Sequence, residues 1–204
     1  MFQHVAPVTR TLILINVAAY FLSMVPDDLS VVYYLALWPW HTSGMPGVPP
    51  FEVWQLVTYG FLHDTASFTH IFFNMFALYM FGSDVERSMG TSKYLSYYFV
   101  CVIGAAIAQT LVMAWANSPP IPTVGASGGV FGLLLAFGIA FPHRRLMLLF
   151  PPIPMPAWLF VTLYGVIELA LGIFGTQQGV AHFAHLGGMA AGYVLIRYWR
   201  RGRR

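Results

Sequence analysis

Charged residues are scarce in this sequence. They make up 8% of the 204 residues, whereas about a quarter of an average soluble domain is charged. Hydrophobic residues make up 58%, which is more apolar surface than a soluble fold of this length can cover. The composition therefore excludes an ordinary soluble domain and indicates a membrane protein.

Cysteine is almost absent, since Cys101 is the only one. A single cysteine excludes an intramolecular disulfide and a structural metal site built from thiolates. Internal repeats and low-complexity stretches are also lacking, so the sequence favours neither a solenoid nor a transporter built from inverted repeats. We therefore predict one membrane domain over residues 1–204.

Apolar runs are abundant. The length of each is close to the roughly 20 residues that a helix needs to cross a bilayer. We count six of them, at about residues 11–25, 70–85, 94–116, 127–141, 157–174 and 181–199. This pattern predicts an all-α membrane protein, a bundle of six transmembrane helices. A long outer loop, residues 26–69, is expected between the first helix and the second.

Positive charge tests this count, because short cytoplasmic loops carry an excess of Lys and Arg. A six-helix path that starts in the cytoplasm puts every basic residue on that side: Arg10, Arg87, Lys93, Arg144, Arg145, Arg197, Arg200, Arg201, Arg203 and Arg204. Four of the acids, Asp27, Asp28, Glu52 and Asp64, fall in the first outer loop. Both termini are thus predicted to be cytoplasmic, and this spread of basic residues argues against a nucleic-acid partner.

Polar residues inside a membrane are costly and tend to mark function. On the six-helix path, Ser127 and His185 lie a few residues deep on the outer side, in separate helices. A histidine at hydrogen-bond distance can take the serine proton and return it to a leaving amine. The alternatives are that Ser127 merely caps its helix and that His185 is structural. Their shared depth favours a nucleophile and its general base.

His70 and Asn74 lie at the same depth, spaced i, i+4 on one helix face. The Asn74 amide and the backbone N–H of Ser127, in the first turn of its helix, are candidate donors to an oxyanion. Alternatively, Asn74 bonds a neighbouring helix. Glu168, in the fifth run, either orients a histidine or is protonated or hydrogen-bonded near the helix top.

Small residues recur every four positions beside the two candidate catalytic residues. This spacing lets membrane helices pack closely, so we expect the fourth and sixth helices to meet along these stripes. The residues are Gly128, Gly132 and Ala136 on the fourth run, and Ala184, Gly188 and Gly192 on the sixth.

Several segments, in the family's order over about residues 8–199, resemble the motifs of the rhomboid intramembrane proteases. They are Trp54-Gln55 through His63, His70-Ile71-Phe72-Phe73-Asn74, Glu86-Arg87, Gly125-Ala126-Ser127-Gly128 and Ala184-His185-Leu186-Gly187-Gly188. The resemblance implies a Ser–His dyad without an aspartate, made by Ser127 and His185, and an oxyanion hole at Asn74 and His70. Phe131 stands where many members have a tyrosine packed on the catalytic imidazole.

The resemblance implies a serine endopeptidase that cleaves transmembrane segments of other membrane proteins near the outer leaflet, without cofactor or metal. We expect a multi-pass protein of a prokaryotic inner membrane, embedded in lipid. One alternative is a zinc protease using His63, His70, His182 and His185, but no His-Glu-x-x-His motif supports it. The others are a rhomboid-like protein that binds membrane proteins without cleaving them, and a channel or transporter.

Overall fold

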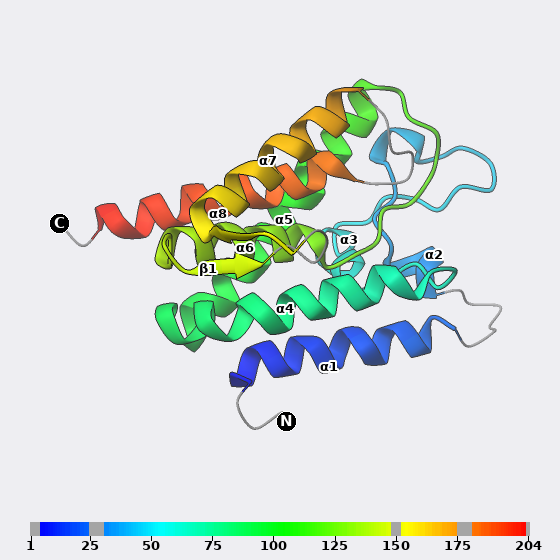
Figure 1. The fold of residues 1–204 in the computed structure, drawn as a ribbon. Coiled ribbons are helices and arrows are strands. Elements are labelled where there is room, and N and C mark those ends of the chain that lie inside the picture. The colour runs from blue at the N-terminus through cyan, green and yellow to red at the C-terminus, as the bar shows by residue number, and fades with distance from the viewer. Residues whose placement is uncertain (1–4, 25–30, 148–151, 175–180, 203–204) are drawn as a thin grey trace.

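A computed structural model describes residues 5–24, 31–147, 152–174 and 181–202 of the chain. Long helices running side by side make up most of it (Figure 1). Within the described ranges, six helices have 14 or more residues: α1 (Pro7–Leu22), α4 (Phe68–Met89), α5 (Thr91–Trp115), α6 (Ser127–Ala140), α7 (Ala157–Phe174) and α8 (His182–Arg201).

Each long helix overlaps one of the six predicted apolar runs. The α7 boundaries agree at both ends, and α6 begins at Ser127 as predicted. The first helix begins earlier than expected, because Pro7 suits the first turn of a helix. By length and hydropathy, α5 and α7 are the described helices able to cross a membrane, and α1 and α6 are apolar but shorter. Six membrane crossings therefore remain a prediction.

The expectation of an all-α fold is wrong between α6 and α7. There β1 (Arg145–Met147) pairs antiparallel with β2 (Pro154–Pro156). The prolines of this connection lack an N–H and cannot continue a helix. Pairing the two short strands instead provides hydrogen-bond partners for this backbone.

The described part of the connection between α1 and α4, residues 31–67, contains four short helices. They are α2 (Val31–Leu35), η2 (Trp40–Thr42), α3 (Gln55–Thr58) and η3 (Tyr59–Phe61). The buried amide of Gln55 holds this segment together, accepting from the N–H of Trp38 at 3.2 Å and donating to the Pro50 carbonyl at 3.2 Å. The part of the predicted outer loop that contains Asp27 and Asp28 lies outside the described residues.

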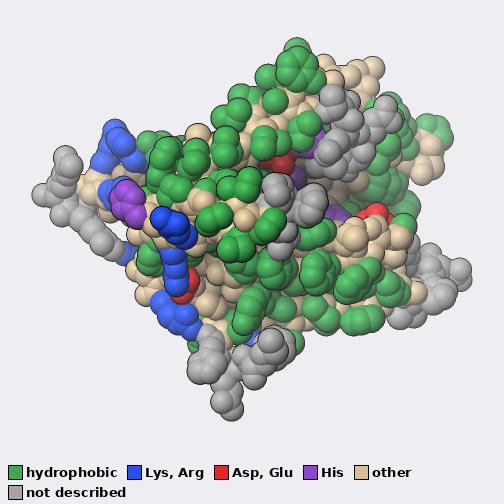
Figure 2. Space-filling model, viewed as in Figure 1, with side chains coloured by type: hydrophobic (Ala, Val, Ile, Leu, Met, Phe, Trp, Pro, Cys, Tyr) green, Lys and Arg blue, Asp and Glu red, His purple; other side chains and the backbone are tan. Residues whose placement is uncertain are grey.

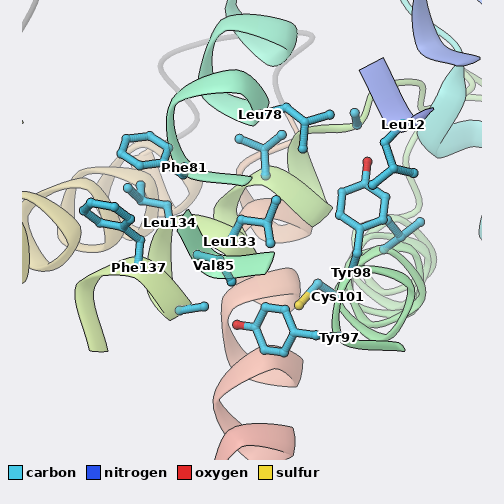
Figure 3. Packing of buried hydrophobic residues seen from close by; sticks show 14 of the residues in the cluster. Leu12, Leu78, Phe81, Val85, Tyr97, Tyr98, Cys101, Leu133, Leu134 and Phe137 are labelled. Atoms are coloured by element: carbon cyan, nitrogen blue, oxygen red, sulfur yellow. The ribbon is translucent and has the colours of Figure 1, made fainter. Parts of the chain in front are cut away.

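Buried side chains of α4, α5 and α6 form the centre of the bundle (Figure 3). Tyr97 and Tyr98 of α5 are fully buried. The Tyr97 hydroxyl donates to the carbonyl oxygen of Gly132 at 2.7 Å, so its polar end is paired inside the core. This contact ties α5 to α6, the helix that carries Ser127.

The predicted close packing of α6 and α8 is confirmed. Gly188 lies directly against the backbone of Gly128, and there is no room for a Cβ at Gly188. The prediction is wrong for Gly192, which faces Tyr97 and Cys101 of α5. The stripe on α8 therefore packs against two neighbouring helices, because α8 contacts both α5 and α6.

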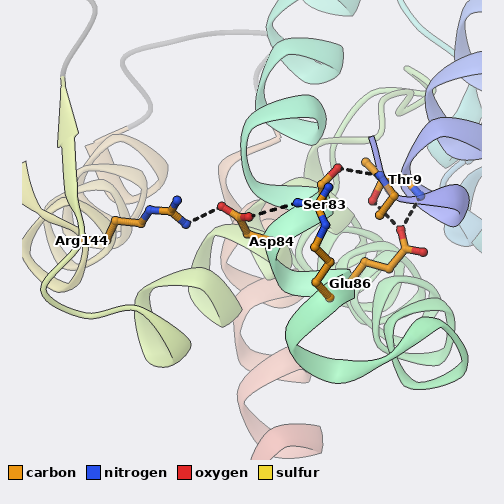
Figure 4. A network of polar contacts seen from close by, with 7 residues as sticks. Thr9, Ser83, Asp84, Glu86 and Arg144 are labelled. Atoms are coloured by element: carbon orange, nitrogen blue, oxygen red, sulfur yellow. Dashed lines mark hydrogen bonds and ion pairs between the residues drawn. The ribbon is translucent and has the colours of Figure 1, made fainter. Parts of the chain in front are cut away.

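The end of α4 is tied to its neighbours by acidic side chains (Figure 4). Glu86 accepts hydrogen bonds from the N–H and hydroxyl of Thr9, both at 2.8 Å. Its carboxylate thus lies at the N-terminus of α1, where the helix dipole favours negative charge. Asp84 forms an ion pair with Arg144, just before β1. In Figure 2 the Lys and Arg side chains gather at this end of the molecule, while hydrophobic side chains cover most of the remaining face.

Candidate active site

Ser127 and His185 meet between the first turns of α6 and α8. The Ser127 Oγ atom lies 2.9 Å from the Nε2 atom of His185, a hydrogen-bond distance. The cap position of α6 is Ala126, and the Ser127 hydroxyl makes no capping bond. The helix-cap interpretation of Ser127 is therefore wrong. The catalytic roles of the two residues stay predictions.

The loop before α6 fixes the direction in which Ser127 enters the helix. Gly125 donates its N–H to the carbonyl oxygen of Tyr59 at 3.0 Å. Its φ is +133°, a conformation that favours glycine. A Cβ at Gly125 would lie 2.8 Å from Nε2 of His70. Glycine here thus brings the backbone against His70 immediately before Ser127.

Two side chains besides Ser127 fix the imidazole of His185. Phe131, one turn after Ser127 on α6, stacks on the ring with 4.2 Å between centroids and 6° between planes. Glu168 of α7 has its Oε2 atom 2.8 Å from Nδ1 of His185. The ring is therefore held on one face and at both nitrogens.

Glu168 also contacts a second histidine, His182, which the sequence suggests only as a candidate zinc ligand and not as a neighbour of the Ser127–His185 pair. Its Oε2 atom lies 2.7 Å from Nδ1 of His182. The spacing of three residues before His185 is the signal that could have identified His182, since it puts both rings on one helix face. These hydrogen bonds are compatible both with a Glu168 that orients a histidine and with one that is hydrogen-bonded near the end of α7, the two readings left open by the sequence.

Glu168, His182 and His185 are also the described His and acidic side chains close enough together to hold a metal ion. Two ligands of a tetrahedral zinc lie about 3.4 Å apart, given bonds of about 2.1 Å. The separations of 2.7 and 2.8 Å are instead those of hydrogen bonds. The His63 and His70 rings, 5.1 Å apart, form a separate pair.

Asn74 and His70, both on α4, line the same cavity as Ser127 and His185. The Asn74 amide donates to the His70 carbonyl oxygen at 2.9 Å, within its own helix, so the predicted alternative of a bond to a neighbouring helix is wrong. This bond uses one of the two amide hydrogens. Nδ1 of His70 accepts from the N–H of Asp64 at 3.3 Å, so the neutral ring carries its proton on Nε2, the atom beside Gly125.

Ser127, His185, Asn74 and His70 all line one cavity of about 1410 Å³. Many of its other lining residues are apolar or aromatic and come from α4, α6 and α7; they include Phe73, Met80, Leu134, Phe160 and Tyr164. A mostly apolar cavity with a few converging polar groups is typical of a binding or catalytic site.

His63 lines the same cavity from the loop before α4. Its side chain is 1% exposed, and neither ring nitrogen has a hydrogen-bond partner among the described residues. Burial, and secondarily the neighbouring His70, lowers the pKa of His63 to about 4. His63 is therefore neutral at neutral pH.

Comparison with known proteins identifies the family of the chain. Residues 50–202 match the Rhomboid domain family. The chain is 33% identical over 138 residues to Rhomboid protein 1, mitochondrial, of Saccharomyces cerevisiae, which is 64% of this chain and 38% of that protein. It is 28% identical over 197 residues to rhomboid protease GlpG of Yersinia pestis, which is 95% of this chain and 62% of that protein.

The chain thus spans less than two thirds of the length of these curated relatives. The matched family region nevertheless covers α4 to α8, the helices that carry Ser127, His185, Asn74 and His70. The resemblance found in the sequence motifs is confirmed, and this chain belongs to the rhomboid family.

Proposed function

We propose that the chain is an intramembrane serine endopeptidase that cleaves transmembrane segments of membrane proteins. One observation carries the proposal: the hydroxyl of Ser127 lies 2.9 Å from Nε2 of His185, inside a cavity also lined by Asn74 and His70. The similarity to a protein named rhomboid protease supports the same activity.

In this proposal Ser127 Oγ attacks the scissile carbonyl carbon while Nε2 of His185 takes the hydroxyl proton. The resulting imidazolium gives that proton to the departing amine, leaving an acyl ester on Ser127. A water molecule, deprotonated by His185, then hydrolyses the ester. A hydrogen bond between nucleophile and base is the geometry that this sequence of steps needs.

The oxyanion of the tetrahedral intermediate needs hydrogen-bond donors. We assign this role to Asn74, whose amide keeps one hydrogen free of the bond to the His70 carbonyl, and to Nε2–H of His70. The backbone N–H of Ser127, at the first position of α6, has no carbonyl one turn back within the helix and is a third donor.

The proposed membrane topology follows from the direction of three helices. The site residues lie in the first two turns of α4, α6 and α8, whereas Arg87, Arg144 and Arg201 lie at or just beyond the other ends of these helices. With positive charge inside, the site lies toward the outer leaflet and both termini are cytoplasmic. We propose that the six long helices cross a prokaryotic inner membrane as one domain, residues 1–204.

The proposed substrates follow from the physics of membrane helices. A transmembrane helix keeps its carbonyl groups hydrogen-bonded, so the scissile bond must be unwound before Ser127 can attack it. Gly, Ala, Ser or Pro near the outer end of a substrate helix makes unwinding easier. The proposed activity requires a lipid bilayer and a membrane-protein substrate, and no cofactor, metal or nucleic acid.

A rhomboid-like protein that binds membrane proteins without cleaving them is the competing function. Labelling of the detergent-solubilised protein with a fluorophosphonate separates the two, because this reagent reacts with an activated serine. We expect wild-type protein to be labelled, Ser127→Ala not at all, and His185→Ala far more slowly. A folded wild-type protein that takes up no more label than Ser127→Ala would favour the non-cleaving function.

A further inference from the structure

We propose that Glu168 is the third member of a hydrogen-bonded chain with Ser127 and His185, and that His182 holds the Glu168 carboxylate in place. The inference rests on the proposed protease function and extends it, because the family resemblance implies a dyad without an acidic residue. Glu168 acts through His185, so it is a positioning residue.

The contacts form a chain of hydrogen bonds across three helices. From α6, Ser127 Oγ lies 2.9 Å from Nε2 of His185 on α8. From α7, Glu168 Oε2 lies 2.8 Å from Nδ1 of the same ring. The side chains of Glu168 and His185 are 12% and 11% exposed, so this part of the chain is largely shielded from water.

The shared oxygen determines where the protons lie. Glu168 Oε2 is bonded to Nδ1 of both His185 and His182. In this proposal Glu168 is ionised; an ionised carboxylate only accepts, so each Nδ1 then donates a proton to it. A neutral His185 protonated at Nδ1 has its lone pair on Nε2, toward the Ser127 hydroxyl. This is the tautomer that a general base requires.

The carboxylate has a second effect during the reaction. When His185 takes the serine proton, it becomes an imidazolium, and the adjacent negative charge of Glu168 stabilises it. Among the described residues, Ser127 and Phe131 of α6 contact the ring, His182 of its own helix lies 6.4 Å away between ring centroids, and His70 and Asp64 line the same cavity. The carboxylate in hydrogen-bond contact with the ring is that of Glu168.

His182 explains how a carboxylate is kept at this depth. A buried carboxylate needs hydrogen-bond donors to offset its lost hydration, and His182 provides one in addition to His185. The His182 side chain is 5% exposed, and its Nε2 atom has no partner among the described residues. Within the part of the chain that the structure describes, its hydrogen bonding is thus directed at Glu168.

The first test compares Glu168→Gln with wild type by steady-state cleavage of a transmembrane substrate. Glutamine keeps the size of the side chain but removes its charge, and its amide can present a donor to Nδ1, which favours the wrong tautomer. Loss of the acidic member of a serine-protease triad costs roughly 10⁴-fold in kcat. We expect kcat to fall by about 100-fold or more, with KM within a few-fold of wild type.

Glu86→Gln is the matched control, because Glu86 is another buried carboxylate that accepts several hydrogen bonds, at the far end of α4. It should lower the melting temperature while the folded fraction keeps its kcat. If Glu168→Gln retains wild-type kcat, or loses activity only in step with its melting temperature as Glu86→Gln does, the inference is wrong.

A second readout is spectroscopic and needs no substrate. In protein labelled with ¹⁵N-histidine, with the His185 signals assigned by their loss in His185→Gln, wild type should show a protonated Nδ1 and an unprotonated Nε2. Glu168→Gln should show a mixture of tautomers or the reverse. An Nε2-protonated His185 in wild type would overturn the inference even if Glu168→Gln fails to fold.

A third comparison isolates His182. His182→Gln keeps a side-chain donor for Glu168, whereas His182→Leu removes it. We expect His182→Leu to lower kcat about tenfold, the equivalent of one hydrogen bond, and His182→Gln to recover most of the loss. Equal activity of the two variants would refute the role of His182.

The two proposals fail in different ways. If wild type neither takes up fluorophosphonate nor cleaves substrate, the protease function is wrong, although the His185 tautomer still reports the bond to Glu168. If wild type cleaves and Glu168→Gln cleaves equally well, only the role of Glu168 is wrong.

Discussion

Gly188 of α8 lies against the backbone of Gly128 in α6, without room between them for a single methyl group. Gly128 directly follows Ser127, and Gly188 comes one helical turn after His185. This glycine contact therefore sets the distance between the two helices where the candidate nucleophile and base meet.

Gly188→Ala should push α8 away from α6 and lengthen the Ser127–His185 hydrogen bond. A misplacement of about 1 Å can cost about 100-fold in rate, so we expect a loss of that order in kcat, together with a lower melting temperature. The control is Gly165→Ala on α7, where a Cβ would meet only Met189, at 3.6 Å or more. Equal, mild effects at both positions would show that the glycine contact does not align the pair.

Gly125→Ala should disturb the oxyanion side of the site. The new Cβ would lie 2.8 Å from Nε2 of His70 and would also strain the backbone at φ +133°. We expect kcat to fall at least tenfold with a modest loss of stability. Gly44→Ala provides the control, because Gly44 also has a positive φ but nothing within 4 Å of the new Cβ. Its backbone strain, about 1–2 kcal/mol, should leave kcat unchanged.

Asn74→Ala should lower turnover by about 100- to 1,000-fold, the usual cost of removing one oxyanion donor, with little change in KM. Asn16→Ala is the matched control: Asn16 is also buried and its amide also donates to a carbonyl one turn back, that of Leu12 on α1. It removes the same local bond far from the site. If the two variants lose only stability, and to the same extent, Asn74 is structural.

His63 should make stability depend on pH. The pKa of His63 is lowered from 6.5 to about 4 in the folded protein, so between these values the unfolded chain binds more protons. The free energy of unfolding therefore falls as the pH drops through this window. One pKa unit corresponds to about 1.4 kcal/mol, which makes the total loss about 3 kcal/mol.

The measurement is the melting temperature in detergent at several pH values between 7.5 and 4.5, for wild type and His63→Leu. Wild type should lose more stability than the variant on acidification, because the leucine does not titrate. Parallel curves for the two proteins would contradict the assignment of this pH dependence to His63.

Hydropathy and charge predicted the helices well, because long apolar runs bounded by polar or proline-rich segments leave few other choices. The start of α6 and both ends of α7 lie at the approximate positions that the apolar runs indicate. The short strands β1 and β2 were missed, because a proline-rich connection shows where a helix stops but not what its backbone pairs with.

The sequence left open whether Glu168 orients a histidine, for a different reason. The helix α7 is apolar around most of its circumference, so its sequence does not indicate which side faces α8. Only that rotation decides whether the carboxylate reaches His185. The direction of the Asn74 amide was equally open, since a neighbouring helix and its own backbone both offer acceptors.

The most direct test of the account is cleavage of a panel of transmembrane segments by wild type, Ser127→Ala, His185→Ala and the double variant, with melting temperatures recorded for all four. Residues that act as one unit give non-additive losses. We therefore expect wild type to cleave at least one segment, each single variant to lose cleavage while staying folded, and the double variant to be no worse than either. Substantial cleavage by folded Ser127→Ala protein would contradict the account.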